Sequence, residues 1–213
     1  MILCLESSAT PTVIGLVREG VQLAERVLME RDRLPAETES LLREANVSPR
    51  DLTAIAVGGG PGSFTGLRVS FAFAKGLARG LSIPIWPVPS LKIIAANLAG
   101  ADHPIAVISP ARRGEAHFAL FDPLLLDVVD GPAVIPYDDL PVRLSKSTRL
   151  LGPGVAKLSE ELRSQLREFI PEDVELHRPH VLHLARLAEQ MWEGRPSPDI
   201  ASLVPEYGLD FPA

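Results

Sequence analysis

A glycine-rich loop lies between an apolar run at residues 54–57 and a segment, residues 65–80, that predicts a helix. The loop reads Gly58-Gly59-Gly60-Pro61-Gly62-Ser63-Phe64-Thr65-Gly66. Glycines allow positive φ angles, Ser63 or Thr65 can cap the helix, and free amides at a helix start can bind an anion. No Gly-Lys-Ser/Thr follows, so the loop is not a P-loop. Two readings stay open: an anion site, or a tight turn that binds nothing.

Glu6 and Ser7 end the first apolar run and are candidate contacts for a weakly bound nucleotide. A carboxylate at that place can hold water around Mg²⁺, whereas the structural alternative is a carboxylate with local hydrogen bonds only. Gly152-Pro153-Gly154 is typical of an ordinary turn and not of a second phosphate loop. Neither a G-x-S-x-G elbow nor an ordered triad surrounds the serines, so no hydrolase chemistry is predicted.

Metal-ligating residues are few and scattered. His180 and His183 would share one helix face, but Pro179 places them at a helix start, and no cysteine or second histidine pair joins them. Cys4 is the sole cysteine, which excludes an internal disulfide and suits a reducing cytosol. We therefore predict neither a metal site nor a cofactor in this chain.

Apolar periodicity predicts an α/β fold. A three-strand meander followed by alternating strands and helices predicts a mixed sheet with helices on its faces. The predicted strands are residues 1–5, 12–17, 21–29, 54–57 and 83–88, and the predicted helices are residues 35–45, 65–80 and 90–98.

A boundary near residue 101 divides the chain. We predict an N-terminal domain at residues 1–101 and a smaller C-terminal α/β domain at residues 102–213, whose tail can pack on either half. The C-terminal part contains predicted strands at residues 105–108 and 115–121, and predicted helices at residues 160–169 and 181–192.

The bulk composition is that of a globular protein. Among 213 residues, 21 Lys and Arg stand against 27 Asp and Glu, for a net charge of −6. An acidic surface does not attract a phosphate backbone, so a partner would have to supply the basic surface for any nucleic acid. Apolar runs are broken well before 18 residues and no basic segment precedes Ile2, so neither a membrane span nor a signal peptide is predicted.

The predicted helix at residues 65–80 is apolar over more of its surface than one core face needs. Its charges, Arg68, Lys75 and Arg79, fall in one narrow strip. Small residues at i,i+4 spacing make a ridge that a second helix can approach closely. The predicted partner interface is Val69, Ala72, Phe73, Gly76 and Gly80. The alternative is that this flank meets a neighbouring helix of its own domain.

The run Gly60-Pro61-Gly62-Ser63-Phe64-Thr65-Gly66-Leu67-Arg68 closely resembles the hallmark of the TsaB (YeaZ) family. Further segments resemble the family in the same order along the chain. They are Leu3-Cys4-Leu5-Glu6-Ser7-Ser8-Ala9-Thr10, Pro87-Val88-Pro89-Ser90-Leu91, Ala111-Arg112-Arg113-Gly114-Glu115 and Pro205-Glu206-Tyr207. Glu6, Pro110 and Gly208-Leu209-Asp210 depart from the family pattern.

The resemblance implies an actin-like (ASKHA) fold of two ribonuclease-H-like half-domains with mixed sheets, in a cytoplasmic protein. It also implies a non-catalytic subunit that docks on TsaD, the threonylcarbamoyl transferase that modifies tRNA. A TsaE-like ATPase would be a further partner, tRNA would be reached through the complex, and the isolated chain could be a homodimer. ATP and metal would bind the partner subunit. TsaD carries an H-x-x-x-H metal pair after its glycine loop, whereas residues 65–80 contain no histidine.

Two rival functions stay open at this point. An actin-like nucleotide-binding enzyme, an ATPase or kinase relative, would hydrolyse ATP by itself. A glycoprotease-type peptidase would need a nucleophile and a base that the sequence does not show.

Overall fold

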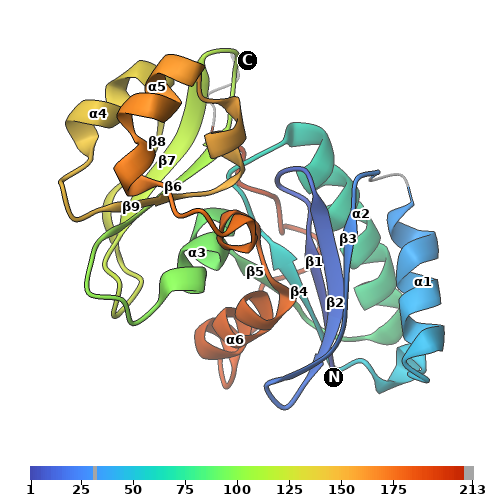
Figure 1. Ribbon diagram of the computed structural model, residues 1–213. Helices are drawn as coiled ribbons and strands as arrows, with labels where there is room; N and C mark the ends of the chain where they lie inside the picture. The colour runs from blue at the N-terminus through green and yellow to red at the C-terminus, as the bar shows by residue number, and fades with distance from the viewer. Residues whose placement is uncertain (31–32, 209–213) are drawn as a thin grey trace.

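The computed structural model describes residues 1–30 and 33–208. Leu209 and Asp210, which belong to the C-terminal departure from the family pattern, lie outside these ranges. The described chain forms two mixed sheets with helices around them (Figure 1). The predicted α/β class is confirmed.

The first sheet has five strands in the order β3-β2-β1-β4-β5. β1 pairs antiparallel with β2 and parallel with β4, so a meander continues into parallel crossovers as predicted. The strands are β1 (Ile2–Glu6), β2 (Thr12–Arg18), β3 (Val21–Leu28), β4 (Ala54–Gly58) and β5 (Ile85–Val88).

Helices cover both faces of the first sheet because side chains alternate along buried strands. Leu3 and Leu5 face the cluster under α1 (Leu34–Glu44) and α2 (Phe64–Leu81). Ile2 and Cys4 face the opposite cluster, which receives α3 (Ser90–Ala95) and α6 (Val181–Trp192).

The second sheet has the order β8-β7-β6-β9, which repeats the antiparallel meander and the first parallel step of the first sheet. Its strands are β6 (Ile105–Pro110), β7 (Glu115–Phe121), β8 (Val128–Pro136) and β9 (Arg149–Leu151). α4 (Leu140–Arg143) and α5 (Glu160–Gln165) cover its outer face (Figure 1). The predicted helix at residues 160–169 is wrong in its length, because the chain tightens to a 3₁₀ turn at Arg167–Phe169.

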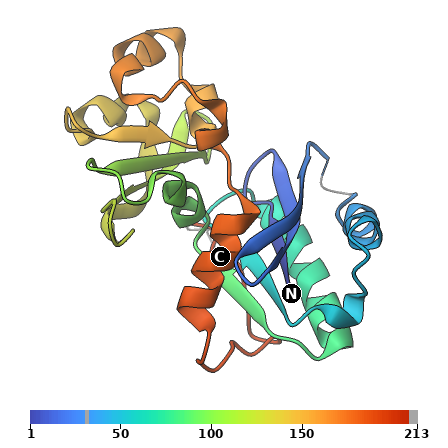
Figure 2. The ribbon, with the colours of Figure 1, turned by 60° about the horizontal axis from the view of Figure 1, so that its bottom comes forward.

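The last part of the chain returns to the first sheet. α6 packs against β1, β2 and β5, on the side opposite α1 and α2 (Figure 2). The following segment continues along the first half, where Trp86 Nε1 donates to Ser197 Oγ at 3.4 Å and Lys75 Nζ donates to the Ala201 carbonyl at 3.2 Å. The strands of the first sheet lie within residues 2–88 and those of the second within residues 105–151, while residues 181–208 lie against the first half.

No helix in the described part of the chain has the length and apolarity needed to cross a membrane.

Candidate functional site

The glycine loop is held by hydrogen bonds to segments on both sides of it. The Gly59 amide donates to the Val88 carbonyl at 2.7 Å, and the Ser63 amide donates to the Ser8 carbonyl at 2.6 Å. Ser63 caps α2, since its Oγ accepts from the Gly66 amide at 3.2 Å. These three amides are therefore bonded within the protein, as expected for a tight turn between a strand and a helix.

The glycines of this loop make room for neighbouring parts of the chain. A Cβ on Gly58 would lie 1.8 Å from Glu6 Oε2, and a Cβ on Gly62 would lie 2.3 Å from the Ser8 carbonyl oxygen. A side chain at either position would displace the end of the first strand. Both glycines are thus needed for internal packing, without any ligand.

Glu6 and Ser7 join the first strand to the glycine loop and to α3. Glu6 is 2% exposed; its Oε1 accepts from the Ser8 amide at 2.6 Å and its Oε2 from Ser90 Oγ at 2.9 Å. Ser7 Oγ donates to the Gly66 carbonyl at 2.8 Å. Burial raises the pKa of Glu6, and the hydrogen bonds from Ser8 and Ser90 offset that shift only in part. A nucleotide contact at these residues stays a prediction, but both side chains already have protein partners.

The C-terminal tail completes this site. The Glu206 amide donates to the Gly59 carbonyl at 2.8 Å, and the Tyr207 ring lies 4.8 Å from the Phe64 ring. The Arg68 guanidinium lies 5.0 Å from the Phe64 centroid. Two segments that carry the family resemblance, the glycine loop and Pro205-Glu206-Tyr207, therefore touch each other although they are far apart in the sequence.

The predicted interface residues of α2 divide into an exposed row and two residues that pack against the core. Ala72, Gly76 and Gly80 are exposed, and nothing lies within 4 Å of a Cβ built on either glycine. Val69 and Phe73 are half-buried and pack against the core. No described helix of the same chain thus covers the row at Gly76 and Gly80, and its use as an interface stays a prediction.

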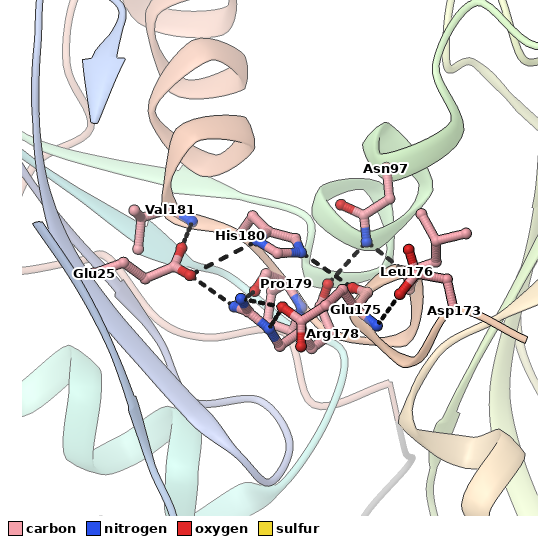
Figure 3. A network of polar contacts seen from close by, with 9 residues as sticks. All are labelled: Glu25, Asn97, Asp173, Glu175, Leu176, Arg178, Pro179, His180 and Val181. Carbon is pink, nitrogen blue, oxygen red and sulfur yellow. Dashed lines mark hydrogen bonds and ion pairs between the residues drawn. The ribbon is translucent and has the colours of Figure 1, made fainter. Parts of the chain in front are cut away.

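His180 is part of an ion-pair network around Glu25 (Figure 3). Its Nδ1 lies 3.7 Å from Glu25 Oε1, while Arg178 Nη1 and the Val181 amide contact Glu25 at 2.8 and 2.9 Å. Burial alone would raise the pKa of Glu25, but hydrogen bonds from His180, Val181 and Arg178 outweigh it and lower the pKa to about 2. In the described ranges, no group of three His, Cys, Asp or Glu is arranged to hold a metal ion.

This network fastens the segment that leads from the second sheet into α6. Asn97 Nδ2 donates to the carbonyls of Leu176 and Arg178, both at 2.9 Å. Glu25 lies on β3, so the segment is tied to β3 on one side and to the turn after α3 on the other (Figure 3). Sequence reasoning missed this site because Glu25 and Arg178 are 153 positions apart.

A cavity of about 800 Å³ lies in the second half, between the turn after β9, α5 and the segment at residues 170–177. Val155, Arg163 and His177 are among its lining residues, and none of the predicted site residues reaches it.

Comparisons with known proteins agree with this architecture. The family model described as TsaD, tRNA N6-adenosine threonylcarbamoyltransferase, matches residues 29–140. The tRNA threonylcarbamoyladenosine biosynthesis protein TsaB of Bacillus subtilis is 33% identical, over 97% of this chain and 93% of its own length. TsaB of Escherichia coli K12 is 32% identical over 55% of this chain and 53% of its own length.

The solved structure of YeaZ from Pseudomonas aeruginosa superposes with a TM-score of 0.77 at 26% identity, covering 97% of this chain and 98% of that one. The actin-like fold with two mixed sheets is therefore confirmed, as is the resemblance seen in the sequence. The chain belongs to the TsaB (YeaZ) family of tRNA threonylcarbamoyladenosine biosynthesis proteins.

Proposed function

We propose that this chain is a non-catalytic subunit of the tRNA threonylcarbamoyladenosine-modifying complex, and that it docks through α2 on a TsaD-type transferase. The observation that carries the proposal is the exposed row Ala72, Gly76 and Gly80, which has open space where a helix can lie. The largest side chain in the row is the methyl group of Ala72, so a partner helix can approach the α2 backbone closely.

The charge of α2 adds a requirement for the partner surface. Arg68 and Arg79 are exposed beside the row, and α2 contains no acidic residue. A matching surface would therefore carry carboxylates near both ends of the contact. A homodimer of the isolated chain through the same row would bring Arg68 and Arg79 of the two copies near one another, so we expect it to be weaker than docking on a surface with carboxylates.

The residues of α2 and of the end of β1 support the subunit role. α2 contains no histidine, so the metal pair that the TsaD resemblance would require is missing. Glu6 and Ser7, the groups best placed to contact a nucleotide, bond to Ser8, Ser90 and Gly66 instead. ATP and metal would then be held by the transferase and by a TsaE-like ATPase.

The acidic chain would reach tRNA only through this complex, in the cytoplasm. Its net charge of −6 gives no electrostatic attraction to a phosphate backbone.

Reconstitution of tRNA modification tests the proposal. The purified chain, given tRNA and threonylcarbamoyl-adenylate, should leave the tRNA unmodified, and modification should appear when the TsaD-type transferase is added. It should also hydrolyse no ATP above background by itself. Modification of tRNA by this chain alone would overturn the subunit role, and ATP hydrolysis by the chain alone would favour the nucleotide-enzyme alternative.

A further inference from the structure

The C-terminal residues Pro205 to Gly208 lie against the glycine loop and bond to its backbone. Gly59 is bonded on both sides: its amide donates to the Val88 carbonyl at 2.7 Å, and its carbonyl accepts from the Glu206 amide at 2.8 Å. The tail therefore continues the backbone pairing at the ends of β4 and β5, where the loop begins.

The tail and the loop approach each other closely at two glycines, Gly60 and Gly208. Gly60 has a φ of +102°, and a Cβ there would lie 1.9 Å from the Glu206 carbonyl oxygen. On the other side, a Cβ on Gly208 would lie 2.6 Å from Pro61 Cβ. The Glu206 carbonyl thus occupies the place that a side chain at position 60 would take. A glycine at this position therefore allows the tail to approach the loop.

An aromatic pair extends this contact into the first turn of α2. The rings of Tyr207 and Phe64 lie 4.8 Å apart at an interplanar angle of 43°, within the range of favourable aromatic pairs. Phe64 is the first residue of α2 and remains 43% exposed, and Arg68 stands over the same ring one turn later.

The tail is a surface strap and not a core segment. Val204 is 73% exposed and the Glu206 side chain is also exposed. Substitutions in this segment can therefore change its contacts with the loop without opening the hydrophobic core.

We propose that the Glu206 backbone and the Tyr207 ring are positioning elements for docking: they hold the glycine loop and the first turn of α2 in the conformation that the partner binds. Phe64 and Arg68 precede the docking row Ala72, Gly76 and Gly80 at the same i,i+4 spacing, and all five residues are exposed, so a change in the first turn alters the surface that leads into the row. The docking consequence rests on the proposed function, whereas the ordering of the loop does not.

Amide hydrogen exchange over residues 59–68 tests the ordering. Glu206→Pro removes the amide that donates to Gly59, and Tyr207→Ala removes the ring. Each should speed exchange in this segment by up to about tenfold, the range expected for losing one such contact. Glu206→Ala keeps the amide and should exchange like the wild type, as should Val204→Ser. Tyr207→Phe keeps the ring and should speed exchange less than Tyr207→Ala does. Unchanged exchange in Glu206→Pro and Tyr207→Ala would overturn the positioning role.

Affinity for the TsaD-type transferase, measured by calorimetry on the same five variants, tests the consequence. We expect Glu206→Pro and Tyr207→Ala to bind about tenfold more weakly, and Glu206→Ala and Val204→Ser to bind like the wild type. Tyr207→Phe should bind more tightly than Tyr207→Ala. Faster exchange with unchanged affinity would overturn the link between the tail and docking. A wild-type chain that fails to bind the transferase at all would overturn the proposed function, while the exchange measurement would still decide whether the tail orders the loop.

Discussion

Glu6 is a buried carboxyl group whose bonding partners are all protein groups. Its oxygens accept from the Ser8 amide and from Ser90 Oγ, and Ser90 Oγ in turn accepts from the Gly60 amide at 3.1 Å. One side chain therefore links the first strand, the glycine loop and α3. A carboxylate in the position typical of a magnesium-water contact serves here as a structural acceptor.

The pH dependence of stability should report on Glu6. Its pKa in the folded protein is raised above the ordinary value of 4.5, mainly by burial. The folded state then binds the proton more tightly than the unfolded chain, so this group favours folding at low pH and loses that contribution as the pH rises through the folded pKa. Relative to Glu6→Gln, the wild type should become less stable as the pH rises above 4.5. Urea unfolding of the wild type and of Glu6→Gln at a series of pH values from 4.5 upward tests this prediction. If the difference between their unfolding free energies did not change with pH, the raised pKa of Glu6 would be contradicted.

At the scale of elements, α2 has clear local signals at both ends. Ser63 caps its first turn, and Ser82 ends it in the left-handed conformation at a φ of 57°. The apolar period between them predicts residues 65–80, and the helix spans Phe64–Leu81. The meander of β1, β2 and β3 is predictable for the same reason, because apolar runs alternate with a glycine turn.

The second half was less predictable. β8 is an exposed edge strand interrupted by Gly131 and Pro132, so its valines and isoleucine do not alternate with polar residues along the strand. β9 has only three residues. The contact between Glu6 and Ser90 joins positions 84 apart, and no local pattern indicates such a pairing.

The contact between the tail and the loop should be visible in stability. Gly60→Ala introduces a Cβ at a positive φ and 1.9 Å from the Glu206 carbonyl, whereas Gly100→Ala introduces one at a φ of +84° with nothing within 4 Å. Backbone strain alone should lower the unfolding free energy of Gly100→Ala by about 1 kcal/mol. Gly60→Ala should lose at least about 2 kcal/mol, because the tail must also move. Equal losses in denaturant titrations would show that the tail contact contributes nothing.

At the scale of the whole molecule, the two halves share a core and an ion-pair network. The cluster containing Cys4 and Val88 of the first half also contains Val107 and Phe121 of the second. The Glu25 network fastens the segment that returns from the second half to the first (Figure 3).

Removal of the Glu25 charge should weaken this connection. Because the folded pKa is lowered to about 2, Glu25 stabilises the protein above its ordinary pKa of 4.5 and loses that contribution as the pH falls from 4.5 to about 2. Glu25→Gln should cost about 1 to 2 kcal/mol at neutral pH and almost nothing near the acid end of this window. Asp130→Asn, which breaks the more exposed pair with Arg143, should cost less than about 0.5 kcal/mol. Chemical denaturation of both variants, at neutral pH and at the acid end of the window, measures these losses. Equal losses of unfolding free energy in Glu25→Gln and Asp130→Asn would contradict a structural role for the network.

The whole chain should fold without a metal ion. A structural metal would stabilise the native state by mass action, and a chelator would remove that stabilisation. We expect the melting temperature measured by circular dichroism to be the same with and without EDTA. A clear decrease in EDTA would contradict the prediction.

The proposed docking of the row Ala72, Gly76 and Gly80 on the transferase is tested by the substitution Gly76→Arg. The substitution places a long cation where a helix should approach, while open space around Gly76 lets the isolated chain keep its fold. Ser164→Arg, on the exposed side of α5, is the matched control. Affinity for the TsaD-type transferase should fall more than about a hundredfold for Gly76→Arg and stay unchanged for Ser164→Arg, with wild-type circular dichroism in both. A folded Gly76→Arg variant that binds the transferase as tightly as the wild type would contradict the account.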